Sequence, residues 1–185
     1  MGLLKFLGVK DKKEERQKWM IQNGEEFMDG VKRNRSLPTV GTSLFLNNGE
    51  QAVLTEKANY LTLRSIRQSV GGGMGTRVGG IGVAGYSSKS ESHKEWRLVD
   101  NGNLTLTSQR LVFVGAKENQ SIALNKIVSV ECALSEIHIS SEGKNSEVSF
   151  TVNNPFVWYA AIGILRKAKN PFALEENEVN VHFGD

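Results

Sequence analysis

The chain has 185 residues, of which 39% are hydrophobic, and a formal net charge of +3, which suits one domain with extensions outside its core. Its single cysteine excludes an internal disulfide and a Cys-only zinc site, and it fits a reducing compartment. No apolar run reaches the length of a membrane span, and the apolar start is too short for a signal peptide. We therefore expect a cytoplasmic protein, with the inner face of the membrane as an alternative location, and no nucleic-acid partner.

Residues 1–32 are rich in Lys, Glu, Gln, Arg and Met and contain no proline, which predicts a helix, although Gly24 weakens a single long one. This helix either docks on the domain or on a partner subunit, or inserts its apolar start into a membrane. Docking is favoured because the apolar stretch is short and acidic residues follow it closely. Residues 1–35 are thus an N-terminal helical extension, and its candidate contact residues are Leu4, Phe6, Trp19, Ile21 and Phe27.

Residues 36–85 contain signals that end a helix and form a turn, and then a run rich in glycine. Pro38 ends the helix, Asn47-Asn-Gly49 predicts a turn, and residues 60–67 predict a strand. Residues 71–85 hold eight of the 19 glycines, which predicts a strongly bent strand or loop with little side-chain packing. Gly80–Gly85 matches the G-x-G-x-x-G pattern of dinucleotide sites, but a poor helix start follows, so we interpret the match as accidental.

Residues 103–115 predict the central hairpin of the fold, with a tight turn at Ser108-Gln109. Directly opposed residues share a face of a sheet, and the face alternates at each step. One face therefore carries Leu104, Leu106, Leu111 and Phe113, and the other carries Thr105, Thr107 and Arg110. Aspartate at Leu106 or Phe113 should unfold the domain, whereas Thr105→Asp should be mild.

Short antiparallel strands are predicted on both sides of this hairpin. Glu95–Val99 predicts one strand, with a turn at Asp100–Gly102 leading into the hairpin. Residues 121–127 predict a strand and a one-turn bend, and residues 128–134, 137–140 and 148–152 alternate as further strands. The alternation places Val128, Cys132 and Leu134 inward, so Cys132 is interpreted as a small core residue and not as a nucleophile.

A largely apolar helix is predicted to follow the last strand. Asn154 can cap its N-terminus, with Pro155 at the first helical position, and Pro171 lies beyond its end. The apolar surface of residues 156–165 is too broad for one exposed face, so we expect the helix to cover the open end of a curved sheet. Trp19, Ile21 and Phe27 within residues 1–32 should cover the rest, either in the same chain or from a neighbouring subunit. Deleting residues 1–35 should therefore leave the sheet folded but expose apolar surface and change the assembly state.

The chain resembles the bacterial pleckstrin-homology-like (PH-like), GRAM-related family in several motifs that occur in order and at short spacing. These are Gly102–Gly115, Ile122–Ile127, Val128–Glu131, and Phe150 with Asn154-Pro155. The resemblance covers roughly residues 45–168. It implies a mainly β (α+β) fold, a strongly bent antiparallel β-barrel or sandwich capped by one C-terminal α-helix. Residues 36–168 would form this domain, followed by an acidic tail of residues 169–185. The fold hosts lipid binding, peptide binding and scaffolding, so it does not select a function.

The sequence contains no H-E-x-x-H, G-x-S-x-G, C-x-x-C or P-loop pattern, and its three histidines occupy polar or exposed positions. We expect no catalytic residue, cofactor or metal, and two binding hypotheses remain. The preferred one is a module for protein interaction or self-assembly, which uses a strand edge, the N-terminal helix or the acidic tail. The other is a module at the membrane that binds anionic lipid headgroups through Lys57, Arg64, Arg67 and Arg77.

Overall fold

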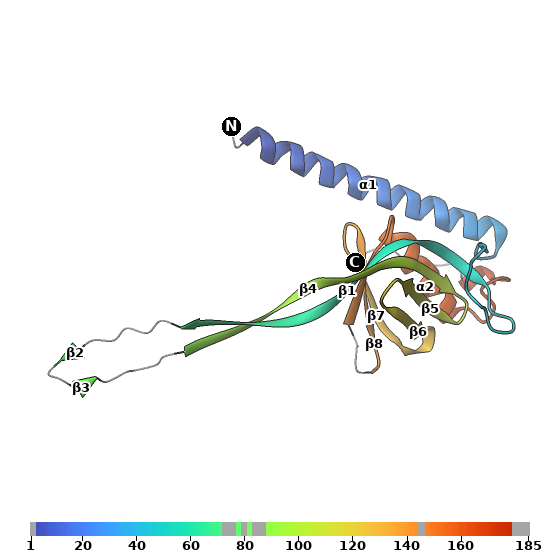
Figure 1. Cartoon of the computed structure of the whole chain (residues 1–185). Coiled ribbons are helices and arrows are strands. Elements are labelled where there is room, and N and C mark those ends of the chain that lie inside the picture. The colour runs from blue at the N-terminus through green and yellow to red at the C-terminus, as the bar shows by residue number, and fades with distance from the viewer. Residues whose placement is uncertain (1–2, 72–76, 79–80, 83–87, 144–146, 179–185) are drawn as a thin grey trace. The chain divides into compact units, whose positions relative to one another are not determined.

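The computed structural model describes residues 3–71, 77–78, 81–82, 88–143 and 147–178, with side chains for residues 12–65 and from 93 onward within those ranges (Figure 1). Helix α1 spans Leu3–Asn34 and helix α2 spans Pro155–Lys167. The strands of the main sheet are β1 (Ala52–Gly71), β4 (Ser88–Thr107), β5 (Arg110–Gly115), β6 (Asn119–Ala123), β7 (Ile127–Cys132), β8 (Glu136–Ser141) and β9 (Glu147–Thr151). Two 3-10 turns are also present, η1 (Leu124–Lys126) and η2 (Glu176–Glu178).

The chain divides into two compact units, the first made of residues 1–62 and 98–185 and the second of residues 63–97. The second unit holds the later part of β1, the earlier part of β4, and the short strands β2 (Arg77–Val78) and β3 (Ile81–Gly82), which pair antiparallel. The described part of the glycine-rich stretch is therefore strand. Because residues 81–82 and the chain from Ser88 are also strand, the described residues provide no helix for a dinucleotide site after Gly80–Gly85.

The seven strands form one sheet in the order β6-β5-β4-β1-β9-β8-β7, so that the first and last strands of the sheet in sequence, β1 and β9, are neighbours. The pairing between them is antiparallel and places Tyr60 opposite Phe150. An antiparallel sheet with two helices confirms the α+β class expected from the sequence. The core contains a triangle of aromatic rings, Tyr60, Phe113 and Phe150, with centroids 5.4 to 5.7 Å apart.

The predicted central hairpin is confirmed in both its register and its buried face. Leu104 pairs with Phe113 and Leu106 with Leu111, and all four side chains are at most 1% exposed. The opposite face, expected to tolerate a charge, is also covered: Thr105 is 3% exposed and Thr107 is fully buried. That expectation was wrong because residues 41–50, which precede β1, lie over the face that carries Thr105 and Thr107.

Three further predictions from local patterns are corrected by longer-range structure. Asp100–Gly102 is not a turn but part of β4, because the Asp100 carboxylate accepts the backbone N–H groups of Lys117 and Glu118 at 2.6 and 2.9 Å. Val128 is 64% exposed, since a register shift between Ile127 and Ser129 makes it an extra residue in β7. Cys132 and Leu134, which lie beyond this shift and were also expected to point inward, are exposed as well.

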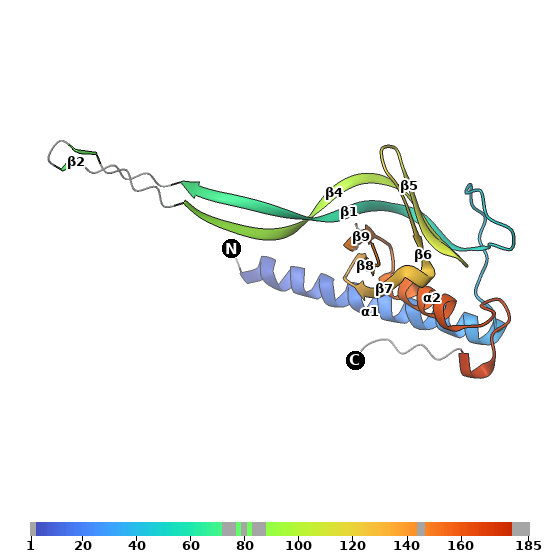
Figure 2. The ribbon, with the colours of Figure 1, turned by 90° about the horizontal axis from the view of Figure 1, so that it is seen from below.

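Helix α2 forms as the sequence predicts and is covered on more than one side. The Asn154 side chain accepts the Phe156 N–H at 3.1 Å, and Pro155 occupies the first turn. The helix contacts β7, β8 and η1, and α1 runs beside it (Figures 1 and 2). Met20, Met28 and Val31 of α1 are buried, so residues from the N-terminal extension do cover this part of the fold.

Helix α1 is continuous through Gly24, contrary to the expectation that this glycine would weaken one long helix. Gly24 lies on the same buried side as Met20 and Met28, at helical spacing. The helix ends at Asn34, and Arg35 has a φ of 49°, in the left-handed region. The C-terminal segment packs here too, because Leu174 is 4% exposed and its N–H bonds to the Arg35 carbonyl at 2.8 Å.

Candidate interaction site

Residues 41–50, here called the Phe45 loop, lie over the threonine face of the central hairpin. The loop leaves the body where the Val40 N–H bonds to the Ala52 carbonyl at 2.9 Å, and it closes at a turn in which Gly49 has a φ of 74°. A positive φ is tolerated by glycine because it has no Cβ, which is why Asn-Asn-Gly folds as a turn at this point. Asn47 then ties the loop to the hairpin turn through a 3.0 Å bond to the Gln109 side chain.

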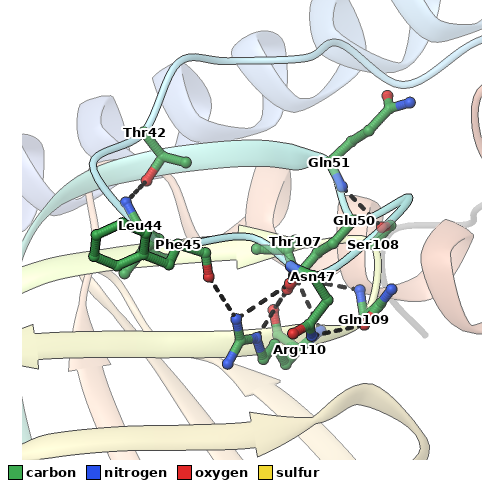
Figure 3. A network of polar contacts seen from close by, with 10 residues as sticks. All are labelled: Thr42, Leu44, Phe45, Asn47, Glu50, Gln51, Thr107, Ser108, Gln109 and Arg110. Carbon is green, nitrogen blue, oxygen red and sulfur yellow. Dashed lines mark hydrogen bonds and ion pairs between the residues drawn. The ribbon is translucent and has the colours of Figure 1, made fainter.

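The Glu50 carboxylate anchors the loop from inside the fold, and its side chain is fully buried. Arg110 binds it through two nitrogens, with Nε 2.8 Å from Oε1 and Nη2 3.1 Å from Oε2 (Figure 3). The Thr107 hydroxyl donates to Oε1 at 2.6 Å, and the Asn47 N–H donates to Oε2 at 2.7 Å. Four hydrogen bonds from three residues therefore satisfy this buried charge.

These bonds keep Glu50 ionised. Burial by itself would raise the pKa of the carboxyl, but hydrogen bonds from Arg110, Asn47 and Thr107 together lower it from 4.5 to about 2. The same contact raises the pKa of the Arg110 guanidinium. At neutral pH the pair is thus a buried carboxylate against a guanidinium that is itself 28% exposed.

The same arginine also fixes the backbone at the tip of the loop. Arg110 Nη2 donates to the Phe45 carbonyl at 3.2 Å, and the Leu44 N–H bonds to the Thr42 hydroxyl at 3.2 Å (Figure 3). In spite of this support, the Phe45 side chain is not packed: the residue is 98% exposed, and Leu46 beside it is 38% exposed. Phe45 is thus a large aromatic side chain that stands outside the fold on a hydrogen-bonded backbone.

A groove of about 410 Å³ lies between the loop and the sheet, beside Phe45. It is lined by Gly41, Thr42, Ser43, Leu44, Phe45, Thr55, Asn103, Thr105 and Val114, none of which is charged. At its base, the hydroxyls of Thr55 and Thr105 bond to each other at 3.0 Å. The groove can therefore take an apolar group without leaving those two hydroxyls unpaired.

The basic residues predicted to hold a lipid headgroup are only partly within the described structure. Lys57 is exposed and lines a second groove, of about 490 Å³, together with Asn59, Asn101, Asn103 and Thr151. Arg64 is exposed but belongs to the second unit, and the side chains of Arg67 and Arg77 lie outside the described residues. A four-residue basic cluster thus stays a prediction.

The predicted contact residues of α1 differ in their exposure. Trp19 and Ile21 are 43% and 40% exposed, whereas Phe27 is partly buried against the core. The side chains of Leu4 and Phe6 lie outside the described residues. The Arg16 guanidinium lies 5.0 Å from the Trp19 ring centroid and bonds to the Asn153 carbonyl at 2.8 Å, so it connects the exposed indole to the start of α2.

The nucleophilic and metal-binding side chains that are described do not gather into one site. His93 is exposed, and His138 lies 4.0 Å from the Glu136 carboxylate, which also accepts the Ser149 hydroxyl. Although Cys132 keeps exposed surface, its thiol lies 3.5 Å from the Pro155 carbonyl, and burial of the sulfur raises its pKa to about 11. In the described part of the chain, no three His, Cys, Asp or Glu side chains are placed to share a metal ion.

Sequence reasoning missed Phe45, Glu50 and their connection to Arg110. The signals were a Leu-Phe-Leu run before the Asn-Asn-Gly turn and a single acid directly after it. Neither signal identifies a surface, because the acid meets an arginine 60 positions away, and it is this arginine that also bonds to the Phe45 carbonyl.

The chain matches no protein-family model, no curated protein and no solved structure. Among the described residues, none of the helices is both long enough and apolar enough to cross a bilayer.

Proposed function

We propose that this protein is a non-enzymatic, PH-like module that mediates protein–protein interaction, including self-assembly. Support for the fold comes from the arrangement implied by the resemblance, strand hairpins followed by one capping helix. The matching residues Gly102–Gly115 fall on β4 and β5, and Ile122–Ile127 falls on the end of β6, η1 and the start of β7. Asn154-Pro155 begins the capping helix α2.

The observation that carries the interaction function is the 98% exposure of Phe45 on a loop whose backbone is fixed by a buried ion pair. Fixing a residue before binding reduces the conformational entropy that is lost when the partner arrives. Aromatic side chains surrounded by uncharged polar groups are also typical of the centre of protein interfaces. The Phe45 loop has both properties, since Thr42, Ser43, Asn47 and Asn48 flank its apolar tip.

A photo-crosslinking amino acid at position 45 of the 185-residue chain tests this proposal in living cells of the organism that makes the protein. The matched control places the same amino acid at Lys126, which is exposed on η1. We expect a light-dependent adduct with a protein, from a second copy or from another chain, at position 45 and not at position 126. If no protein adduct forms at position 45, the proposal is wrong.

Helix α1 offers a second contact surface for the same function. Met20 is buried, while Trp19 and Ile21, on either side of it in sequence, keep about two fifths of their surface exposed. The helix therefore docks on its own fold by one stripe and leaves two large apolar side chains beside that stripe. Deletion of residues 1–35 should remove this surface and uncover the part of α2 that α1 contacts, with increased binding of a hydrophobic dye as the readout.

The Lys57 groove supports a second candidate function, the binding of an anionic lipid headgroup. A lysine ammonium surrounded by Asn and Thr side chains is a suitable donor set for a phosphate or carboxylate. This function predicts sedimentation with vesicles that contain phosphatidylserine, lost at high salt and reduced by Lys57→Ala or by Arg64→Ala together with Arg67→Ala. Equal sedimentation with neutral and anionic vesicles would remove the candidate.

A further inference from the structure

We propose that the Phe45 loop and the groove beside it form a two-fold self-association surface, in which Phe45 of each copy enters the groove of the other. This inference rests on the proposed interaction function and names the partner as a second copy of the chain.

The Phe45 side chain is exposed on a backbone that is already ordered. Phe45 is 98% exposed, and its carbonyl is held by Arg110, whose position is set in turn by the buried Glu50. The side chain can rotate, but the backbone that carries it is hydrogen bonded on both sides of the tip, at Leu44 and at Asn47. Most of the ordering that a flexible loop would need on association has therefore already taken place.

The receiving groove suits a phenyl ring. Its volume, about 410 Å³, lies within the roughly 300–1,000 Å³ range of sites that enclose small organic groups. Thr55 and Thr105 bond to each other at its base, and Val114, which is 40% exposed, contributes an apolar wall. A ring that enters would cover Val114 and the methyl groups of the two threonines.

The position of the two features favours a second copy as the occupant. Phe45 both projects from the surface and lines the groove, so one patch carries the projection and the recess side by side. A two-fold contact requires this self-complementarity, because the same patch is used by both copies. The groove lining contains no charged residue, and the nearby Glu50 is buried against Arg110, so two identical patches meet without like-charge repulsion.

The size of the contact predicts its strength. A buried phenylalanine removes about 150–250 Å² from water, so two rings and the groove walls that they cover give a total of roughly 600–1,000 Å². Stable interfaces bury about 1,200 Å² or more. The structure therefore predicts a weak, concentration-dependent dimer, which other contacts such as those of α1 could strengthen in a larger assembly.

Analytical ultracentrifugation of the full-length protein, at concentrations up to about 1 mM, tests the inference with two complementary variants. Phe45→Ser removes the projecting ring from an exposed position, so the fold should be unaffected. Gly41→Leu adds a bulky side chain to the groove lining, and it should do so without strain because a Cβ at Gly41 meets no other atom within 4 Å. Each variant should weaken association at least about tenfold. Val128→Ser, at a 64% exposed apolar residue of β7, is the control and should leave association unchanged.

Mixing the two variants provides the sharpest result. In a mixed dimer, Phe45 of the Gly41→Leu copy can still enter the open groove of the Phe45→Ser copy. We therefore expect the mixture to associate more strongly than either variant alone, which a contact that does not insert Phe45 into this groove would not produce.

Several outcomes would overturn the inference. These are a wild-type monomer at 1 mM, association that depends on Trp19 and Ile21 but not on Phe45, and a mixture no stronger than its components. Monomers that bind neutral phosphatidylcholine vesicles through Phe45 would assign the loop to a bilayer instead. A monomer that still forms a crosslink from position 45 to a different protein overturns only this inference, whereas a monomer without any crosslink overturns the proposed function as well.

Discussion

The buried Glu50 carboxylate gives the most quantitative prediction, and Glu50→Gln is the substitution that tests it. Glutamine has nearly the same shape but removes the charge that Arg110, Thr107 and Asn47 satisfy. The pKa of Glu50 falls from 4.5 to about 2 in the folded protein. At about 1.4 kcal/mol for each tenfold change in proton affinity, the charged form of Glu50 contributes about 3 kcal/mol to the free energy of unfolding.

The pH dependence of this contribution follows from the direction of the pKa change. Because the folded pKa is lower than the unfolded pKa, the stabilisation is complete above pH 4.5 and is lost as the pH falls toward 2. Glu50→Gln should therefore cost about 3 kcal/mol at pH 7 but only about 1 kcal/mol at pH 3. Other carboxyl groups titrate over the same range, but they contribute equally to both proteins and cancel in the difference.

Urea unfolding of the wild type and of Glu50→Gln at both pH values measures this difference. Glu25→Gln, an exposed position of α1, is the matched control and should cost less than about 0.5 kcal/mol at either pH. If Glu50→Gln costs the same at pH 7 and at pH 3, the loss comes from packing and not from the charge, and the reasoning is refuted.

Three further predictions concern the body of the fold. In urea unfolding, Gly102→Ala should destabilise the protein by about 1–3 kcal/mol, because a Cβ there would overlap the Val114 carbonyl. Gly163→Ala in α2 should instead stabilise it by up to about 1 kcal/mol, because a Cβ at that position meets no other atom and alanine favours a helix. Thr105→Asp should lower the melting temperature clearly, though less than Leu106→Asp, because both positions are buried and only the threonine already has a polar partner. Arg35→Gly should raise the free energy of unfolding by up to about 1 kcal/mol, since its φ of 49° suits glycine; an unchanged or lower value would show that other contacts of Arg35 outweigh the backbone.

The central hairpin and α2 could be predicted because local patterns determine both. In the hairpin, the two-residue period of the side chains allows only one register that buries Leu106 opposite Leu111. In α2, Asn154 and Pro155 act within one turn of the chain. Interactions of this kind are visible in a short window of sequence, and the structure confirms them.

The errors arise where distant segments change the meaning of a local signal. Asp100-Asn-Gly is a common turn sequence, yet Asp100 accepts N–H groups from residues 117 and 118, and Gly102 is needed where the backbone of Val114 approaches closely. In the same way, alternation alone cannot show that residues 41–50 cover Thr105. A pattern of apolar and polar residues reports which face is more apolar, but not whether a second layer covers the other face.

The Phe45 loop combines two features that a stable fold would not need together. A buried ion pair gains little stability over apolar packing of the same volume, and an exposed phenylalanine gains none. Here the ion pair of Glu50 and Arg110 extends to the Phe45 carbonyl, so it holds the backbone that carries the exposed ring. Under the proposed interaction function, this connection gives Glu50 a second role, the positioning of the Phe45 backbone, besides the stability of the hairpin. Loosening the loop by Glu50→Gln should therefore weaken Phe45-dependent association even under conditions where the domain remains folded.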